Sequence, residues 1–363
     1  MKQKILHIPN FYPPHIGGIE DVCHSIVKNS PECEHRVLCF HDKQETQYDR
    51  YEGVEVVRCG VWKKLFSQAI SFSYLGELRR MFKTFAPDIV HFHTPNPLGS
   101  VCLLLTLPRK TRLIVHHHSD IVAQKILSVF YSPIEQSLLS KADKIVATSP
   151  TYIPGSRPLK PWKEKIQVLP NTVDPSKLEI REGDEEKIQA IKDKYGNKKI
   201  VFAFGRNVPY KGFNYLLDAA EQLPEGAIII IAGGGSFPPT KNCFFPGRLS
   251  DEELRCYLHA SDVFAFPSIT KNEAFGIALA EAMYCGLPAV TFTIPESGVN
   301  WVCLDGENGL EAVNRDTDSL AAAINRLLRD KPLRKTLGQQ ARERAKRLFT
   351  PEAVKKEIEK LYK

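Results

Sequence analysis

Short apolar segments alternate with stretches of helical periodicity along nearly the whole chain of 363 residues. Strands that are joined by helices pair in parallel, so this alternation predicts parallel sheets with helices on both faces. The segments form two series, which predicts an α/β fold with two doubly wound, Rossmann-like domains. The first series predicts strands over residues 5–8, 36–39, 54–58, 89–92, 113–115, 144–147 and 166–169. The second predicts strands over residues 200–204, 227–231, 243–245, 263–266 and 289–292.

A turn-rich segment from Pro170 to Pro175 separates the two series. Proline and asparagine favour turns, and the charged run that follows is typical of a domain boundary. We therefore expect domains over residues 1–170 and 171–349, with a last helix over residues 350–363. Ligands bind at the carboxyl ends of strands in open α/β sheets, so two such sheets facing each other predict a ligand cleft.

Composition narrows the class of protein. Hydrophobic residues make up 43% of the chain and charged residues 25%, which is typical of globular domains. No apolar run reaches the length of a transmembrane helix, no signal sequence is visible, and the nine cysteines show no CxxC spacing. These features predict a cytoplasmic protein whose thiols are reduced.

The positive charge is concentrated in the first expected domain. The net charge is +7, and the whole excess of lysine and arginine lies in residues 1–170. A basic domain beside a neutral one favours an anionic partner, such as an anionic membrane surface or a pyrophosphate-linked acceptor. Nucleic acid is disfavoured as a partner because no nucleic-acid-binding motif accompanies the charge.

Two glutamates, Glu273 and Glu281, are separated by seven residues where the strand over 263–266 turns into a helix predicted over 275–284. Glu273 falls outside that helix and Glu281 inside it. A carboxylate would repel a phosphate at the helix start, whereas it accepts hydrogen bonds from sugar hydroxyls. The pair therefore favours a sugar-nucleotide site. The alternative is an acid that complements the helix dipole, together with a solvated helix glutamate.

Basic and glycine-rich segments follow other predicted strands. Gly205, Arg206 and Lys211 follow the strand over 200–204, and two cations at a helix start suit a diphosphate without any metal. The alternative is a solvated basic loop. Gly17 and Gly18 follow the first strand, where they permit close approach of the backbone to a phosphate or sugar. The alternative there is a plain turn.

Histidines end two neighbouring predicted strands. His91 and His93 end one strand, and His116, His117 and His118 end the next. Side chains alternate along a strand, so we expect His116 and His118 to project together toward the cleft. Most of these histidines are expected to be structural, with one or two of them making polar contacts to sugar. A zinc site is the alternative, but adjacent histidines without a helical H-x3-H spacing are a weak signal for metal.

These segments, in this order, resemble the retaining glycosyltransferases of family 4, which have the two-domain GT-B fold, and most of all those that build bacterial exopolysaccharide, capsule or O-antigen. The resemblance covers nearly the whole chain. It includes the segments 11–20, 93–98, 118–122, 147–150, 170–174, 205–212, 245–249 and 273–281. The chain between Gly235 and Phe244 departs from the family because it is short, with prolines in place of an expected helix.

The resemblance implies transfer of a hexose from a UDP- or GDP-sugar to a saccharide acceptor that is lipid-linked. It implies that the leaving phosphate takes the acceptor proton on the same face, with no metal and no cofactor. The final helix, 350–363, is expected to pack back on the first domain. A GT-B-fold epimerase or hydrolase acting on sugar nucleotides is the alternative from another enzyme class, and a catalytically silent, membrane-associated binding protein is a third reading.

The resemblance also implies roles for individual residues. The catalytic set is His118, Glu273, Arg206 and Lys211. The donor-binding set is Gly17, Gly18, Gly205, Arg206, Lys211, Arg248, Leu249, Glu273, Ala274, Phe275, Gly276 and Glu281. The acceptor-binding set is His93, Asn96 and Asp120. Within the donor set, Arg206 and Lys211 are expected to hold the diphosphate, Glu281 the ribose, and Glu273 the donor sugar.

Residues 62–85 combine apolar residues near helical spacing with five flanking basic residues, Lys63, Lys64, Arg79, Arg80 and Lys83. Such a segment predicts an amphipathic helix. In one reading the helix covers the sheet of the first domain with a solvated basic rim. In the other, the first domain rests on an anionic leaflet at the inner face of the plasma membrane, and both can hold at once.

Overall fold

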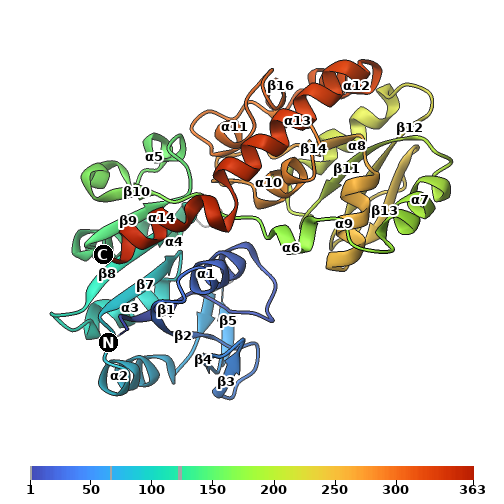
Figure 1. The fold of residues 1–363 in the computed structure, drawn as a ribbon. Helices are drawn as coiled ribbons and strands as arrows, with labels where there is room; N and C mark the ends of the chain where they lie inside the picture. Colours follow the sequence, from blue (N-terminus) through green and yellow to red (C-terminus); the bar gives the residue numbers. More distant parts are fainter. Residues whose placement is uncertain (1, 66–67, 122–124) are drawn as a thin grey trace. The chain divides into compact units, whose positions relative to one another are not determined.

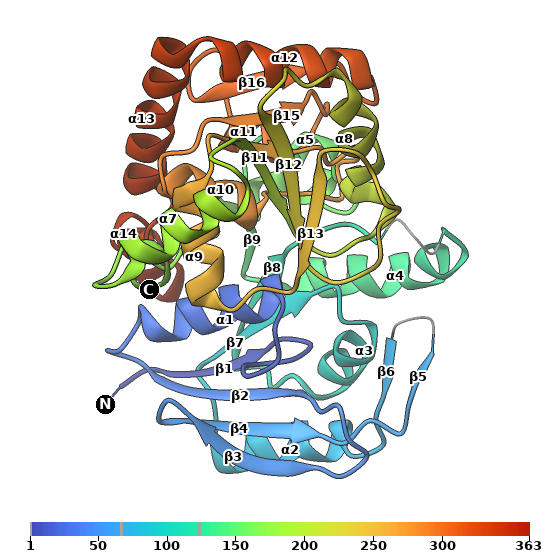
Figure 2. The same cartoon turned by 90° about the vertical axis from the view of Figure 1, so that its right-hand side faces the viewer.

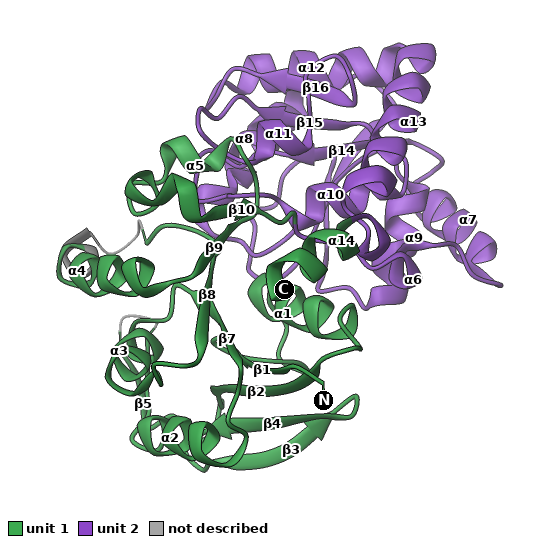
Figure 3. Cartoon of the chain, turned by 60° about the vertical axis from the view of Figure 1, so that its left-hand side comes forward, with its two compact units in different colours: residues 1–170, 354–363 green, residues 171–353 purple. Residues whose placement is uncertain are grey.

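A computed structural model describes residues 2–65, 68–121 and 125–363 (Figure 1). The chain divides into two compact units (Figure 3). Unit 1 comprises Met1–Pro170 and Val354–Lys363, and unit 2 comprises Asn171–Ala353.

Unit 1 is built on an eight-stranded sheet. Its strands are β1 (Lys4–Ile8), β2 (Glu34–Phe40), β3 (Gln47–Tyr51), β4 (Val54–Cys59), β7 (Ile89–Thr94), β8 (Arg112–His117), β9 (Lys144–Ala147) and β10 (Ile166–Val168). The order across the sheet is β10-β9-β8-β7-β1-β2-β4-β3, and only β3 runs antiparallel to its neighbour. The strand order reverses beside β1, which pairs with β2 on one side and β7 on the other.

Helices cover both faces of this sheet. They are α1 (Gly18–Lys28), α2 (Tyr74–Thr84), α3 (Pro97–Thr106), α4 (Lys125–Lys141), α5 (Tyr152–Gly155), η1 (Lys160–Lys165) and α14 (Pro351–Tyr362). Figure 3 shows α1 and α14 on one face, with α2 and α3 on the other. The Tyr362 hydroxyl of α14 lies 2.8 Å from His91 Nδ1, and Gln167 Nε2 donates to the Glu357 carbonyl at 2.8 Å. These bonds fix the last helix on the sheet of unit 1.

Unit 2 has a six-stranded sheet in which every pairing is parallel. Its strands are β11 (Lys199–Phe204), β12 (Ala227–Ala232), β13 (Cys243–Gly247), β14 (Val263–Phe266), β15 (Ala289–Phe292) and β16 (Gly309–Ala312). The order is β13-β12-β11-β14-β15-β16. The strands β12 and β14 are apolar throughout and buried, as expected when helices cover both faces of a parallel sheet.

The helices of unit 2 are α6 (Pro175–Leu178), α7 (Asp184–Lys194), η2 (Pro209–Lys211), α8 (Phe213–Ala219), η3 (Ala220–Gln222), α9 (Asp251–Ala260), α10 (Ile277–Tyr284), α11 (Val299–Val302), α12 (Thr317–Arg329) and α13 (Lys331–Leu348). Figure 2 shows α8 on one face of the sheet, with α9 and α10 on the other. This placement agrees with right-handed crossovers. The connection from β11 to β12 through α8 runs across the sheet in one direction, and the connections through α9 and α10 run in the other, so their helices lie on opposite faces.

Several predicted boundaries were wrong. Residues 62–85 do not form one helix: β5 (Lys63–Leu65) and β6 (Gln68–Ile70) form a hairpin, residues 66–67 lie outside the described part, and only Tyr74–Thr84 is helical. Leu78 and Met81 of α2 are buried in unit 1, which confirms that this helix covers the sheet. The strands β3 and β16 were missed, since β3 is a polar edge strand and the four residues of β16, which include Glu311, do not form an apolar run.

Among the described residues, no helix is both long and apolar enough to cross a membrane. All nine cysteines are free thiols, and all except Cys285 are buried.

Candidate active site

The sheet of unit 2 has a topological switch point between β11 and β14. Connections from β11 lead toward β13 on one side, whereas β14 leads toward β16 on the other. The loops that leave the carboxyl ends of two such strands diverge, and ligands bind in the crevice between them. Lys211 follows β11 and Glu273 follows β14, so the switch point brings together two residues that are far apart in the sequence.

Lys211 and Glu273 form an ion pair between the Lys211 ammonium and Glu273 Oε2. Each side chain is only 14% exposed. The ammonium also lies 4.9 Å from the centre of the Phe266 ring, and Ser268 Oγ lies 3.4 Å from the same carboxylate oxygen. The two residues were expected to bind different parts of a donor. The structure shows that they also pair with each other.

Glycine at 212 allows the two loops to pack closely. Gly212 has φ +65 and caps α8, and a Cβ atom there would lie 2.1 Å from the carbonyl oxygen of Pro267 in the loop after β14. Any other residue would push the loops apart and separate Lys211 from Glu273.

The start of α10 lies beside the ion pair in the same loop. Gly276 has φ +94 and caps α10, so the helix begins at Ile277 and not at Phe275 as predicted. Gly276 has no side chain that could cap α10, and backbone N–H groups at a helix start are suited to meet an anion. Ser297 Oγ donates to the Glu273 carbonyl at 2.6 Å and fixes the backbone beside the carboxylate. Sequence reasoning missed Ser297, because no motif links it to this loop.

Other expected donor residues of unit 2 lie in or after elements at the same edge of the sheet. Arg206 follows β11 and is exposed, and Arg248 follows β13 and is also exposed. Glu281 is half-buried in α10. Ala274 and Phe275 are buried, and the Phe275 ring packs against Phe349 at 5.2 Å, so their side chains belong to the core.

The short segment between β12 and β13 contains no helix, as its prolines predicted. With α8 it lines a pocket of about 570 Å³ that includes Asn207, Phe213, Ser236 and Phe237. The loop after β11 is tied to this segment, since Asn207 Nδ2 donates to the Ser236 carbonyl at 2.9 Å.

In unit 1, His118 follows β8 at the carboxyl edge of the sheet. Its Nε2 lies 2.9 Å from His93 Nδ1, and its ring stacks on His116 with centroids 4.2 Å apart. The shared face of His116 and His118 confirms the predicted alternation. Burial, together with His117 and His91, lowers the pKa of His118 to about 3, so the imidazole is neutral at physiological pH.

The other residues expected at this site make structural contacts. Asn96 Oδ1 accepts the Gly99 N–H at 2.9 Å and caps α3. Asp120 Oδ1 lies 2.9 Å from His117 Nε2 and accepts from Ser156 Oγ at 2.6 Å. Gly17 precedes α1, and a Cβ atom on it would lie 2.2 Å from a carboxylate oxygen of Glu20.

The chain thus consists of two doubly wound α/β units, with a paired cation and carboxylate at the switch point of the second, where α/β sheets of this kind bind ligands. The model of Glycosyltransferase Family 4 matches residues 16–177, and that of Glycosyl transferases group 1 matches residues 184–344. The chain is 30% identical to the O-antigen chain mannosyltransferase C of Escherichia coli, over 96% of this chain and 94% of that protein. It is 28% identical to the D-rhamnosyltransferase WbpZ of Pseudomonas aeruginosa, over 96% and 92%.

Solved structures show the same fold. A sucrose-phosphate synthase from Thermosynechococcus elongatus superposes with a TM-score of 0.81 at 19% identity, over 99% of this chain and 98% of that one. The Anabaena HepE protein in complex with UDP and glucose gives 0.77 at 18% identity, over 99% of both chains. The chain therefore belongs to glycosyltransferase family 4 and has the GT-B fold, as the sequence motifs predicted, and it is a glycosyltransferase.

Proposed function

We propose that the protein is a retaining glycosyltransferase that moves a hexose from a UDP- or GDP-sugar to a saccharide acceptor during synthesis of a cell-surface polysaccharide such as O-antigen. The ion pair of Lys211 and Glu273 at the switch point of unit 2 is the observation that carries the proposal. The names of the two relatives, an O-antigen chain mannosyltransferase and a D-rhamnosyltransferase, support hexose transfer, and the first of them supports O-antigen synthesis.

The chemistry of the pair suits a nucleotide-sugar donor. Lys211 supplies a cation for the diphosphate, and exposed Arg206 after the same strand supplies a second. The carboxylate of Glu273 only accepts hydrogen bonds, so it suits the hydroxyl groups of the donor sugar and not the ionised diphosphate, which has no hydrogen-bond donor. Because Glu273 already neutralises Lys211, Arg206 and the start of α10 are needed to balance the added charge of the diphosphate.

Retention follows if the bond from the anomeric carbon to the diphosphate breaks and the acceptor oxygen bonds to that carbon on the same face, while the leaving phosphate takes the acceptor proton. The lysine and arginine stabilise the charge that develops on the leaving diphosphate, so the reaction requires no metal and no cofactor. His118 lies beside the reacting sugar in this proposal. Its low pKa keeps it neutral, so it donates or accepts a hydrogen bond without placing positive charge next to the electron-poor anomeric carbon.

The acceptor in this proposal is lipid-linked, which requires peripheral contact of a cytoplasmic enzyme with an anionic membrane. The hairpin of β5 and β6 fits that contact better than α2, whose apolar face is already buried. Trp62 and Phe72 flank the hairpin, are 57% and 79% exposed, and have ring centres 5.7 Å apart. Exposed aromatic residues beside Lys63 and Lys64 suit a membrane interface.

Cosedimentation with liposomes tests this membrane contact. Binding should rise with the fraction of anionic lipid and weaken in high salt, since each basic residue near the surface adds roughly 1 kcal/mol. Replacing Lys63 and Lys64 by glutamine should reduce binding more than the matched change of Arg79 and Lys83 on α2. An equal loss of liposome binding in the two variants, or binding that does not depend on lipid charge, would show that the hairpin does not mediate the membrane contact.

Acceptor dependence separates transfer from the alternative epimerase or hydrolase. A thermal-shift screen first identifies the donor, because a ligand at about 100 times its dissociation constant stabilises by roughly 2.7 kcal/mol. Release of nucleoside diphosphate is then measured with and without an acceptor glycan. Transfer predicts release that depends on the acceptor, whereas equal release without an acceptor would favour hydrolysis.

A further inference from the structure

Five histidines lie on one face of three neighbouring strands in unit 1. His7 of β1 pairs in register with His91 of β7, and His93 of β7 pairs with His116 of β8, while His118 follows β8. The ring centres of His91 and His93 are 4.7 Å apart, and those of His93 and His116 are 5.3 Å apart. The helices α1 and α14 cover this face of the sheet (Figure 3).

Several ring nitrogens of this cluster are completely buried, and within the described part of the chain they have no hydrogen-bond partner. They are His7 Nδ1, His91 Nε2, His93 Nε2, and both nitrogens of His116. Buried polar atoms are normally hydrogen-bonded, and each exception costs free energy. Five such atoms in one cluster, all of them potential metal ligands, indicate a missing partner.

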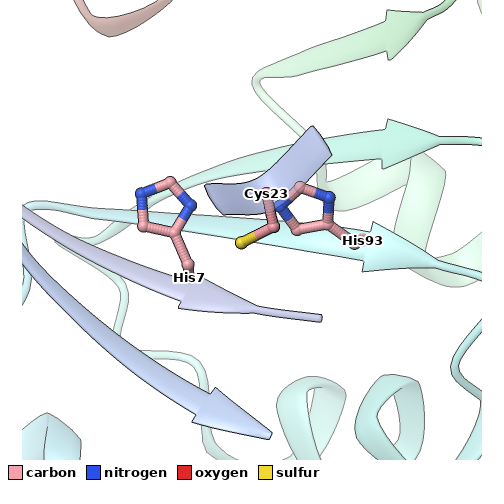
Figure 4. A group of neighbouring side chains, drawn as sticks. All are labelled: His7, Cys23 and His93. Carbon is pink, nitrogen blue, oxygen red and sulfur yellow. The ribbon is translucent and has the colours of Figure 1, made fainter. Parts of the chain in front are cut away.

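Cys23 of α1 adds a sulfur to the cluster. A ligand atom of Cys23, one of His7 and one of His93 all lie within 4.8 Å of one another. Figure 4 shows the sulfur between the two imidazoles, each of which turns a nitrogen toward it. The side chain of Cys23 is fully buried, like those of both histidines.

A chain of hydrogen bonds sets the tautomer of His7. The Ser30 carbonyl accepts from His35 Nε2 at 2.8 Å, so a neutral His35 has no proton on Nδ1. His35 Nδ1 therefore accepts from His7 Nε2, 3.1 Å away. The proton of His7 is thus on Nε2, and the lone pair of Nδ1 faces the cluster. Ligating histidines in metal sites are oriented in this way by a bond from the other ring nitrogen.

We propose that His7 Nδ1, His93 Nε2 and Cys23 Sγ bind one Zn²⁺ ion inside unit 1. Neutral imidazoles and a thiolate are the ligands that zinc prefers. His91 and His116 form a second group with His93 at the same spacing, and one of them supplies the fourth ligand. Tetrahedral zinc needs ligand atoms about 3.3–3.8 Å apart, which small rotations of these side chains provide.

Zinc binding replaces the thiol proton. The Cys23 S–H bond breaks, a Zn–S bond forms, and the proton goes to solvent. Burial first, and then Cys39 and Glu20, raise the pKa of the thiol, so without an ion the cysteine is protonated. Because every ligand atom is buried, the ion enters while unit 1 folds and does not exchange readily afterwards. The ion holds His93, and through it His118, in place and takes no part in transfer.

Metal content after refolding tests the site. The full chain is unfolded, refolded with Zn²⁺ or with a chelator, desalted, and its zinc is measured by elemental analysis. Wild type refolded with Zn²⁺ should retain about one ion per chain and should melt several degrees higher than the chelator-refolded protein. Cys23→Ser should lose the ion, whereas Cys102→Ser, which changes another buried cysteine of unit 1, should keep it.

Zinc content in wild type no higher than in Cys23→Ser would overturn the proposal. If Cys23→Ser does not fold, wild type refolded with Co²⁺ gives the answer. A thiolate ligand produces a strong near-ultraviolet charge-transfer band with Co²⁺, and its absence would equally rule out the site.

Discussion

The ion pair of Lys211 and Glu273 can be tested by a double-mutant cycle. Exposed pairs contribute about 0–1 kcal/mol, and breaking a fully buried pair costs about 3–5 kcal/mol. With each side chain 14% exposed, we expect a coupling free energy between these limits, about 1–3 kcal/mol. Lys211→Met and Glu273→Gln should each destabilise unit 2, and the double variant should be more stable than the sum of the two changes predicts.

Transfer should respond differently from stability. Each single change should lower kcat/KM by about 10²- to 10³-fold, because each removes a contact with the donor that acts in the transition state. The double variant should be no more active than either single variant. A pair that serves only to hold the two loops together would instead regain activity when both charges are removed.

The assay needs a signal from unit 2 alone. Trp301 lies in unit 2 and packs against Phe349 at 5.6 Å, whereas Trp62 and Trp162 lie in unit 1. Urea unfolding followed by fluorescence, in a background with Trp62 and Trp162 changed to phenylalanine, therefore reports unit 2. Lys199→Met is the matched control, since Lys199 pairs with Asp262 at the opposite end of β11. Recovered transfer in the double variant, or lost transfer in this control, would refute the reasoning.

Three further predictions follow from other contacts. Arg206→Ala should cost about 2–4 kcal/mol in transition-state stabilisation, and wild-type activity should persist in EDTA; restoration by Mn²⁺ after chelation would contradict the metal-free mechanism. His118→Ala should impair kcat more than His117→Ala, whose main effect should be a lower melting temperature, because His117 lies on the other face bound to Asp120; equal kinetic losses would contradict this. Asp184→Asn should lower the unfolding free energy of unit 2 by about 3–5 kcal/mol at neutral pH, since it leaves Arg255 buried and unpaired. The hydrogen bond from Arg255 lowers the pKa of Asp184, so the stabilisation is present above the unfolded pKa of about 3.9 and is lost as the pH falls through the lower folded pKa. The unfolding free energies of wild type and Asp184→Asn should therefore converge as the pH falls, and a difference that stays constant with pH would be inconsistent with the pairing.

The core strands were predictable because a strand buried on both faces is apolar throughout. The segment Ala227–Ala232 is uniformly apolar, and the structure buries every residue of it. The helix after β14 was also predicted, but not its start. Only the left-handed conformation of Gly276 shows that α10 begins at Ile277.

The pairing of Lys211 with Glu273 could not be predicted from the sequence. Each residue was identified as a candidate from its own loop, after its own strand. Their contact depends on β11 and β14 being neighbours, which follows from the strand order of the folded sheet. The spacing of residues along the chain carries no such information.

The arrangement of the histidines was likewise predictable within one strand but not between elements. Alternation along one strand predicted that His116 and His118 share a face, which the stacked rings confirm. The approach of His7 and Cys23 to His93 depends on β1 lying beside β7 and on the docking of α1. Neither the pairing of β1 with β7 nor the docking of α1 could be inferred from the positions of these residues along the chain.

The most direct test of the central claim is acceptor-dependent release of nucleoside diphosphate by wild type and by Glu273→Gln, with the donor found in the thermal-shift screen. The account predicts release by wild type only when the acceptor glycan is present, and a loss of about 10²- to 10³-fold in Glu273→Gln. Near-normal turnover of Glu273→Gln, with its fold intact, would contradict the assignment of this carboxylate to the donor sugar.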